Sequence, residues 1–361
     1  MSERPLKIRL LVPANIGHNS GGTVYNTMLA RELAALGAVV ELLPVDGSWP
    51  IGTAKERRRL GRLLGEWGTG AVVTTDTPEA VTIVDGLIAC GAPDELEYAA
   101  AAGRRNWVLL HMPVDGHPDC EGRALRAAAG VICTSTSAAA EISERHNIHG
   151  VKTALPGTTP AETAAGSDPP RLIVVAALLP NKDQLLAVGA LAQLKTLPWT
   201  ASLVGSDSAD PGYARLVRDA MGHYGLQDRV RITGQLTGEA LEEEWGAADL
   251  SLLVSRAETF GLVVTESIAR GIPAVVRKGT GAEEALAYGS KAPSGAQPAL
   301  PGAAVELDAD PAPLAEVLRE WLTQAELRAG WREAALAARG QLPGWDSTAR
   351  AVREALRRGE I

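Results

Sequence analysis

The alternation of short apolar runs with longer amphipathic stretches is the feature that most constrains how this chain can fold. Stretches with helical periodicity lie between the apolar runs, such as TVYNTMLARELAALG (23–37), which Gly37 ends. Continuous apolar strands that alternate with helices are typical of an α/β doubly wound parallel sheet with helices on both faces. The runs predicted as buried strands in the first half are KIRLLVP (7–13), AVVELLP (38–44), GAVVTTD (70–76), NWVLLHMP (106–113) and GVICTS (130–135).

A second set of strands and helices follows the segment ALPGTTPAETAAGSDPP (154–170), which has no hydrophobic period and is typical of a linker. The rhythm restarts at RLIVVAAL (171–178) and continues to PAVVRK (273–278). We expect two Rossmann-like domains, residues 1–160 and 161–344, facing each other across a cleft that binds ligands at the carboxyl ends of the strands. The amphipathic segment 345–361 follows a Pro-Gly break and is expected to pack back onto the first domain.

The composition excludes several classes of function. The 361 residues carry a formal net charge of −8. Nucleic-acid binding is not expected, because neutralising phosphates requires a basic face. The cysteines Cys90, Cys120 and Cys133 are odd in number and form no CxxC pair, which predicts reduced thiols in the cytoplasm and no zinc site.

Membrane contact is also not expected. The opening MSERPLKIRLLVP has too short an apolar core for a signal peptide, and no run approaches the ~18 apolar residues of a membrane span. The stretch KERRRLGRLLGEW (55–67) has two interpretations, a basic amphipathic helix on anionic lipid or an ordinary helix that covers the sheet. We favour the second, because Glu56 and Glu66 interrupt the positive charge.

Two glutamates, Glu258 and Glu266, stand in the mostly apolar run SRAETFGLVVTESIARGIPAVV (255–276). A strand is expected to end near Ser255, and a helix is expected over residues 262–270. Backbone N–H groups are unpaired at such a strand-to-helix turn, and the helix dipole favours an anion there. Gly261 allows a phosphate to approach the backbone closely.

The two acids flank this expected phosphate site. Glu258 comes just before the turn, whereas Glu266 lies two turns into the helix and can reach a vicinal diol, as an acid does for ribose in dinucleotide folds. The pattern predicts a ligand made of a sugar, a diphosphate and a nucleoside. In the alternative interpretation, Glu258 only caps the helix and Glu266 is a solvated surface acid.

The ExFG motif, with seven residues between the two acids, resembles the signature of the retaining family-four glycosyltransferases, which have the GT-B fold. The resemblance covers nearly the whole chain. It implies an enzyme that moves a hexose-type sugar from a nucleotide-diphosphate sugar to a hydroxyl of a small polar acceptor; the acidic balance would tolerate an aminocyclitol. The other segments that resemble the family are GGTVYNTMLARELAALGAVVELL (21–43), LLPNKDQLLAVGALAQL (178–194) and the stretch from RVRITG to PAVV (229–276).

The resemblance also implies roles for individual residues on the donor side. Glu258 would contact hydroxyls of the transferred sugar, Glu266 would bind the ribose, and Lys182 would neutralise the leaving diphosphate. A fixed ammonium favours the transition state, because charge grows on the diphosphate as the bond breaks. Leu236 would flank the nucleobase. The phosphate and sugar would bind the backbone amides of Thr259, Phe260, Gly261 and Leu262.

In the first domain, the resemblance implies that His111 lies near the reacting centre and that the amides of Gly21 and Gly22 meet the diphosphate. His117 and His18 are weaker candidates for acceptor contacts. The structural alternatives remain a surface lysine at Lys182, a structural His111, a plain turn at the glycines and a core leucine at Leu236.

One position departs from the family pattern. The family usually has an arginine about five residues before the phosphate lysine, and this chain has Ala177 there. Arg256 and Lys278 are the nearby candidates to replace it.

The resemblance implies front-face transfer, because no second carboxylate faces Glu258 as a double displacement requires. We expect no metal and no cofactor besides the nucleotide sugar, and we interpret DAD (308–310) as a chance match to the DxD metal motif. The alternatives are a nucleotide-sugar epimerase of the same fold and a non-catalytic nucleotide-sugar binding subunit. A phosphorylase and an NAD-dependent dehydrogenase have less support. The oligomeric state is left open.

Overall fold

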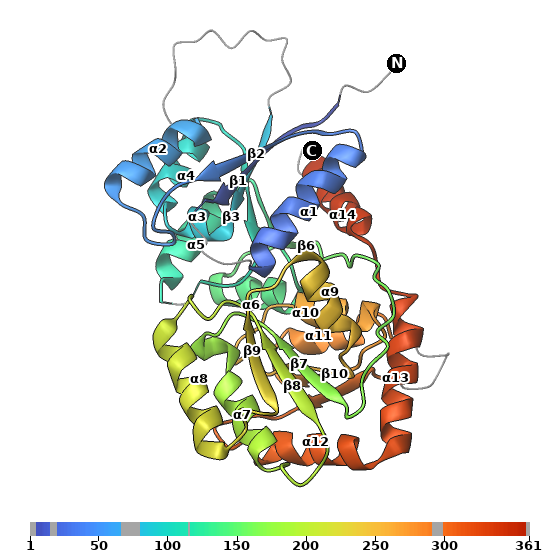
Figure 1. Ribbon diagram of the computed structural model, residues 1–361. Coiled ribbons are helices and arrows are strands. Elements are labelled where there is room, and N and C mark those ends of the chain that lie inside the picture. Colours follow the sequence, from blue (N-terminus) through green and yellow to red (C-terminus); the bar gives the residue numbers. More distant parts are fainter. Residues whose placement is uncertain (1–4, 15–19, 66–79, 115, 291–298, 359–361) are drawn as a thin grey trace. The chain divides into compact units, whose positions relative to one another are not determined.

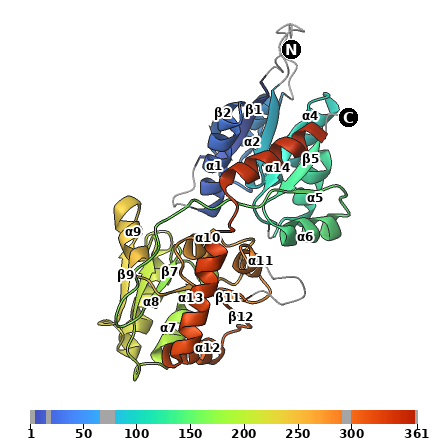
Figure 2. The ribbon, with the colours of Figure 1, turned by 90° about the vertical axis from the view of Figure 1, so that its right-hand side faces the viewer.

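The computed structural model describes residues 5–14, 20–65, 80–114, 116–290 and 299–358 (Figures 1 and 2). The chain divides into two compact units. Unit 1 contains residues 1–157 and 345–361, and unit 2 contains residues 158–344. Each unit is an α/β layer structure around its own parallel sheet.

Over the described residues, the sheet of unit 1 has six strands in the order β2-β1-β3-β4-β5-β6. All of its strand pairs are parallel, and the chain moves outwards from β1 to β2 before it returns to β3 on the other side. The point between β1 and β3 is therefore the topological switch of this sheet. The strands are β1 (Lys7–Pro13), β2 (Val39–Val45), β3 (Val81–Asp85), β4 (Asn106–Leu110), β5 (Gly130–Cys133) and β6 (Lys152–Thr153).

Helices cover both faces of this sheet. The first and last helices of the unit lie side by side, and α2, α4 and α5 pack on the other side (Figure 1). The apolar side of α2, with Leu60 and Leu64, is buried, as a helix that covers a sheet requires. The helices are α1 (Gly21–Ala35), α2 (Ala54–Leu64), α3 (Gly86–Cys90), α4 (Pro93–Ala101), α5 (Pro118–Ala127), α6 (Thr136–His146) and α14 (Trp345–Arg358).

The sequence interpretation missed strand β3. The apolar run of β3 continues directly into the buried helix α3, so hydrophobic periodicity does not separate the two elements. The strand expected at 70–76 lies outside the described residues. None of the helices in the described part of the chain has both the length and the apolar character that crossing a bilayer requires.

In the described part of unit 2 the sheet also has six parallel strands, in the order β12-β11-β10-β7-β8-β9. The strands are β7 (Arg171–Val175), β8 (Thr200–Val204), β9 (Val230–Gly234), β10 (Leu250–Leu253), β11 (Ala274–Arg277) and β12 (Gly302–Val305). The helices are η1 (Pro180–Lys182), α7 (Gln184–Ala192), α8 (Pro211–Tyr224), α9 (Gly238–Gly246), α10 (Leu262–Ala269), α11 (Ala282–Ala287), α12 (Ala312–Thr323) and α13 (Ala325–Arg339).

The two faces of this sheet bury separate apolar clusters. Leu172 belongs to the larger cluster, which includes Trp199 and residues of α7, α8 and α12. Ile173, its neighbour in the chain, belongs to the second cluster, with Trp245 of α9. Successive strand residues point to opposite faces, so a continuous apolar run fills both clusters.

The segment treated as a linker in the sequence is packed in unit 2 from residue 158 onwards. Ala164 is buried, and its N–H donates to the Arg270 carbonyl at 2.9 Å. The Asp249 carboxylate accepts from the N–H groups of Ser167 and Arg171 at 3.0 and 2.9 Å. A polar, non-periodic composition can therefore encode an ordered extended segment when neighbouring elements satisfy its backbone.

The C-terminal helix α14 completes the core of unit 1. Trp345 is buried and packs edge-on against Tyr25 of α1, with ring centroids 5.6 Å apart. The Thr348 hydroxyl donates to the Leu155 carbonyl at 2.7 Å. The last segment of the chain therefore folds with the first 157 residues.

The packing of α14 gives a first prediction. Trp345→Ala removes a buried indole and its contact with Tyr25, so we expect the free energy of unfolding to fall by about 3–5 kcal/mol. Denaturant unfolding followed by circular dichroism measures the change. Arg350→Ala is the control, because Arg350 is exposed on the same helix and pairs with the exposed Asp346. Equal midpoints for Trp345→Ala and the wild type would contradict the assigned packing.

Candidate functional site

The turn between β10 and α10 is shaped by two glycines at the carboxyl edge of the sheet of unit 2. Gly261 is the N-cap of α10 with φ +92°, a left-handed conformation that side chains disfavour, and a Cβ there would lie 2.9 Å from Leu253. Gly281 packs beneath the turn, where a Cβ would lie 1.7 Å from the Thr259 carbonyl oxygen. The sequence interpretation missed Gly281, because its constraint comes from a residue that is distant in the chain.

The N-cap residue of α10 is a glycine, so it offers no capping side chain. The Glu258 carboxylate binds Lys182, and among the described residues no hydrogen bond from it to the first turn of α10 is found. The first-turn N–H groups of an uncapped helix attract an anion. Of the residues whose amides were expected to bind the donor, Thr259, Leu262 and Gly261 lie at this turn, and Phe260 directs its ring into the protein, where it packs edge-on against Tyr288 at 5.3 Å.

Lys182 and Glu258, which the sequence interpretation treated separately, are brought together by the fold. The Lys182 ammonium lies 2.9 Å from Glu258 Oε2, and the two side chains are 24% and 18% exposed. Lys182 ends the short helix η1 after β7, and Glu258 follows β10, the neighbouring strand in the sheet. The pair is a charge-assisted hydrogen bond at the edge where parallel strands place ligands.

Glu266 is partly buried on α10, and burial raises the pKa of its carboxyl to about 7. The positive charge of Arg270 opposes this rise, and Glu242 adds to it. The Arg270 guanidinium donates to the Glu242 carboxylate and to the backbone carbonyl of Glu266. Within the described part of the chain, no hydrogen bond to the Glu266 carboxylate is found. This environment differs from that of a solvated surface acid.

Leu236 lies in the loop after β9, partly buried against the cluster that contains Val263 of α10 and Trp245. Its position at the carboxyl edge of the sheet agrees with a place beside a ligand, and its packing also agrees with a loop leucine.

Unit 1 has its own polar cluster around His111, which follows β4. His111 Nε2 lies 3.0 Å from Asn26 Oδ1 and 3.3 Å from Asp85 Oδ2, and Asn26 donates to the same Asp85 oxygen at 2.9 Å. Both neighbours of Nε2 are acceptor oxygens, so we assign the proton to Nε2, which leaves Nδ1 as an acceptor in the neutral ring. Tyr25 packs edge-on against the ring at 5.2 Å.

The two expected glycines open helix α1 beside this cluster. A Cβ at Gly22 would lie 3.2 Å from the His111 ring, so glycine allows the helix to approach the imidazole closely. Ser20 caps α1 by accepting from the N–H of Thr23 at 3.2 Å, which occupies part of the helix N-terminus next to Gly21.

The sequence interpretation missed Asn26 and Asp85. The signal for Asp85 was a single acid at the end of the apolar run VTIVD, and the signal for Asn26 was a buried polar residue one turn after the glycines. His117 is exposed at the start of α5, and His18 lies outside the described residues.

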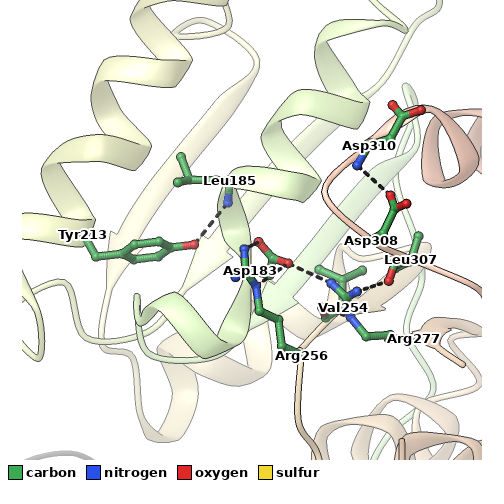
Figure 3. A network of polar contacts seen from close by, with 9 residues as sticks. All are labelled: Asp183, Leu185, Tyr213, Val254, Arg256, Arg277, Leu307, Asp308 and Asp310. Atoms are coloured by element: carbon green, nitrogen blue, oxygen red, sulfur yellow. Dashed lines mark hydrogen bonds and ion pairs between the residues drawn. The ribbon is translucent and has the colours of Figure 1, made fainter. Parts of the chain in front are cut away.

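The DAD segment makes hydrogen bonds to the backbone just before α12. Asp308 accepts from the N–H of Asp310 at 2.7 Å (Figure 3). Asp310 accepts from the N–H of Ala312, the first residue of α12, at 2.9 Å. Across the described ranges, no three His, Cys, Asp or Glu side chains gather as a metal site would need.

Comparison with known proteins supports a glycosyltransferase. Residues 158–337 match the family described as "Glycosyl transferases group 1". Over 68 residues the chain is 41% identical to mannosylfructose-phosphate synthase from Agrobacterium fabrum; this match covers 19% of the chain and 15% of that protein.

Solved structures resemble the chain over almost its full length. A glycosyltransferase from Rickettsia africae has a TM-score of 0.74 at 15% identity, covering 99% of both chains. Anabaena HepE with UDP and glucose has a TM-score of 0.70 at 18% identity, covering 98% of this chain and 100% of that one. Sucrose-phosphate synthase from Thermosynechococcus elongatus has a TM-score of 0.71 at 18% identity, covering 98% of both. The chain therefore belongs to the group 1 glycosyltransferases and has their GT-B fold.

Proposed function

We propose that this protein is a retaining glycosyltransferase that moves a hexose-type sugar from a nucleotide-diphosphate sugar to a hydroxyl of a small polar acceptor. The observation that carries the proposal is the pairing of Lys182 with Glu258 in front of the uncapped helix α10, with the carboxylate of Glu266 on the same helix. The similar Anabaena HepE binds UDP-glucose, and starch synthase IV from Arabidopsis thaliana binds ADP, which supports a nucleotide-sugar donor.

In this proposal the donor extends along the turn. Its diphosphate binds the amides of residues 259–262 and the Lys182 ammonium, its ribose hydroxyls donate to Glu266, and its base lies near Leu236. The transferred sugar donates hydroxyls to Glu258. Lys182 would exchange the Glu258 carboxylate for an oxygen of the donor diphosphate. The attraction between Lys182 and the diphosphate grows as the departing diphosphate gains charge. Lys182 would therefore stabilise the transition state more than the ground state.

The proposed transfer takes place on one face of the sugar. The bond from the anomeric carbon to the phosphate oxygen breaks, the acceptor oxygen bonds to the same face, and the departing phosphate oxygen takes the acceptor proton. The protein contributes positioning and charge stabilisation, with no cofactor or metal. In unit 1, His111 would take part in the reaction through its ring, which Asn26 and Asp85 would hold in a fixed orientation.

A non-catalytic nucleotide-sugar binding subunit is the second candidate, because Ala177 stands where the family usually has an arginine. Such a subunit would bind the nucleotide without turnover. Cytoplasmic location and the absence of nucleic-acid and membrane partners remain part of the proposal.

An activity assay tests the proposal and separates it from the second candidate. The protein is incubated with ADP-, GDP- and UDP-sugars and a panel of small polar acceptors, the released nucleoside diphosphate is measured, and the anomeric configuration of the product is read by NMR. We expect turnover with retention, and we expect Lys182→Gln to lower kcat by about 10²-fold. Lys195→Gln is the control, because Lys195 is exposed and donates only to the Tyr224 carbonyl. Nucleotide binding without turnover would favour the binding subunit.

The raised pKa of Glu266 gives a pH prediction. The folded protein holds the pKa of Glu266 at about 7, above the ordinary value of 4.5 for a glutamate, so the contribution to stability is full below pH 4.5 and is lost as the pH rises through 7. Glu266→Gln removes this loss, so we expect the variant to be more stable than the wild type at pH 8 by up to about 3 kcal/mol, and little changed at pH 4.5.

Thermal unfolding between pH 4.5 and pH 8 measures this difference, with Glu243→Gln, an exposed acid of α9, as the control. The ionised form of Glu266 would accept the ribose hydroxyls, so nucleoside affinity should rise with pH through 7 in the wild type and stay flat in Glu266→Gln. Parallel pH–stability curves for the wild type and Glu266→Gln would contradict the shifted pKa.

A further inference from the structure

The proposed donor carries more negative charge than Lys182 can balance. An esterified diphosphate has about two negative charges, and about three after it departs. Lys182 is already paired with Glu258, so the two side chains together contribute no net charge before the donor arrives. A further cation is therefore needed at the same edge of the sheet.

Arg256 lies beside the loop that carries Lys182. Its backbone N–H donates to the Asn181 carbonyl at 2.8 Å. Its guanidinium binds Asp183, the residue after Lys182, with Nε 3.0 Å and Nη2 3.2 Å from the two carboxylate oxygens (Figure 3). The Arg256 side chain is nevertheless 65% exposed, so a ligand can reach it.

Asp183 does not neutralise Arg256, because a second arginine already balances its charge. Arg277 Nη2 lies 2.7 Å from Asp183 Oδ2, and these two side chains are 9% and 5% exposed. The Arg277 guanidinium also donates to the carbonyls of Val254 and Leu307, which fixes it in the protein (Figure 3). The buried pair holds Arg256 in place and leaves its positive charge in surplus.

Lys278, the other cation near this edge, has its own partner. Its ammonium lies 2.7 Å from Glu306, and both side chains are mostly exposed. The ion pairs at Asp183 and Glu258 comprise three cations, Lys182, Arg256 and Arg277, and two carboxylates. Arg256, the most exposed cation of the three, carries the charge that the two carboxylates do not balance.

We propose that Arg256 is the second cation for the donor diphosphate, acting with Lys182 and replacing the arginine that this chain lacks at Ala177. The inference rests on the proposed function. The planar guanidinium can keep Nε and Nη2 on Asp183 while Nη1 donates to a phosphate oxygen, and Asp183 and Arg277 position it.

Binding of a nucleoside diphosphate, compared with binding of its nucleoside, tests this inference. Isothermal titration uses whichever of ADP, GDP and UDP the wild type binds most tightly, together with the matching nucleoside. We expect Arg256→Gln to weaken the diphosphate by about tenfold and to leave the nucleoside unchanged, because only the phosphate contact is lost. Arg256→Lys should retain part of the affinity, because lysine keeps the positive charge but lacks the planar set of N–H donors of the guanidinium.

Two control variants separate the possible outcomes. Lys278→Gln removes the same charge from a neighbouring loop and should bind the diphosphate as the wild type does. Unchanged diphosphate binding in Arg256→Gln, with weakened binding in Lys182→Gln, would overturn the inference and leave the proposed function standing. Equal loss for nucleoside and diphosphate in Arg256→Gln would also overturn it, because that result indicates a structural role. No effect in either Lys182→Gln or Glu266→Gln would overturn the proposed function, and the inference with it.

Discussion

The left-handed turn at Gly261 is the constraint on which the proposed donor site depends. It allows β10 to pass into α10 without a capping side chain, so the helix begins with its N–H groups uncapped at the carboxyl edge of the sheet. The turn is enclosed on two sides, by Leu253 next to Gly261 and by the close approach of Gly281 to the Thr259 carbonyl. Because packing fixes the turn, the positions of Glu258 before it and Glu266 after it are fixed as well.

Each unit combines a parallel sheet with a polar cluster where its strands end. In unit 1 the cluster joins Asn26, Asp85 and His111 from helix α1 and two neighbouring strand ends. In unit 2 the corresponding residues are ionic, and Lys182 and Glu258 follow the adjacent strands β7 and β10. The same architecture thus holds a hydrogen-bonded cluster around a histidine in one unit and a lysine–glutamate ion pair in the other.

The sequence predicted the fold class well, because continuous apolar strands and amphipathic helices are local signals. The doubly wound GT-B architecture is confirmed, and helix α10 begins at Leu262 as expected. The ion pair between Lys182 and Glu258 could not be predicted, because 76 positions separate its members and only the strand order brings them together. The same holds for Arg277 and Asp183, which are 94 positions apart. Strand β3 was missed for a different reason, since its apolar run merges with the next helix.

The contact between Lys182 and Glu258 also affects which molecules can occupy the site. The protein without ligand already satisfies both charges internally, so an incoming molecule must compete with a preformed internal partner. A free neutral sugar brings no anion to displace Glu258 from the ammonium, whereas a phosphorylated ligand does. Every ligand that binds here must separate Lys182 from Glu258, which costs free energy, and only an anionic ligand gives the ammonium a new partner. This exchange of partners would provide selectivity against the abundant unactivated sugars.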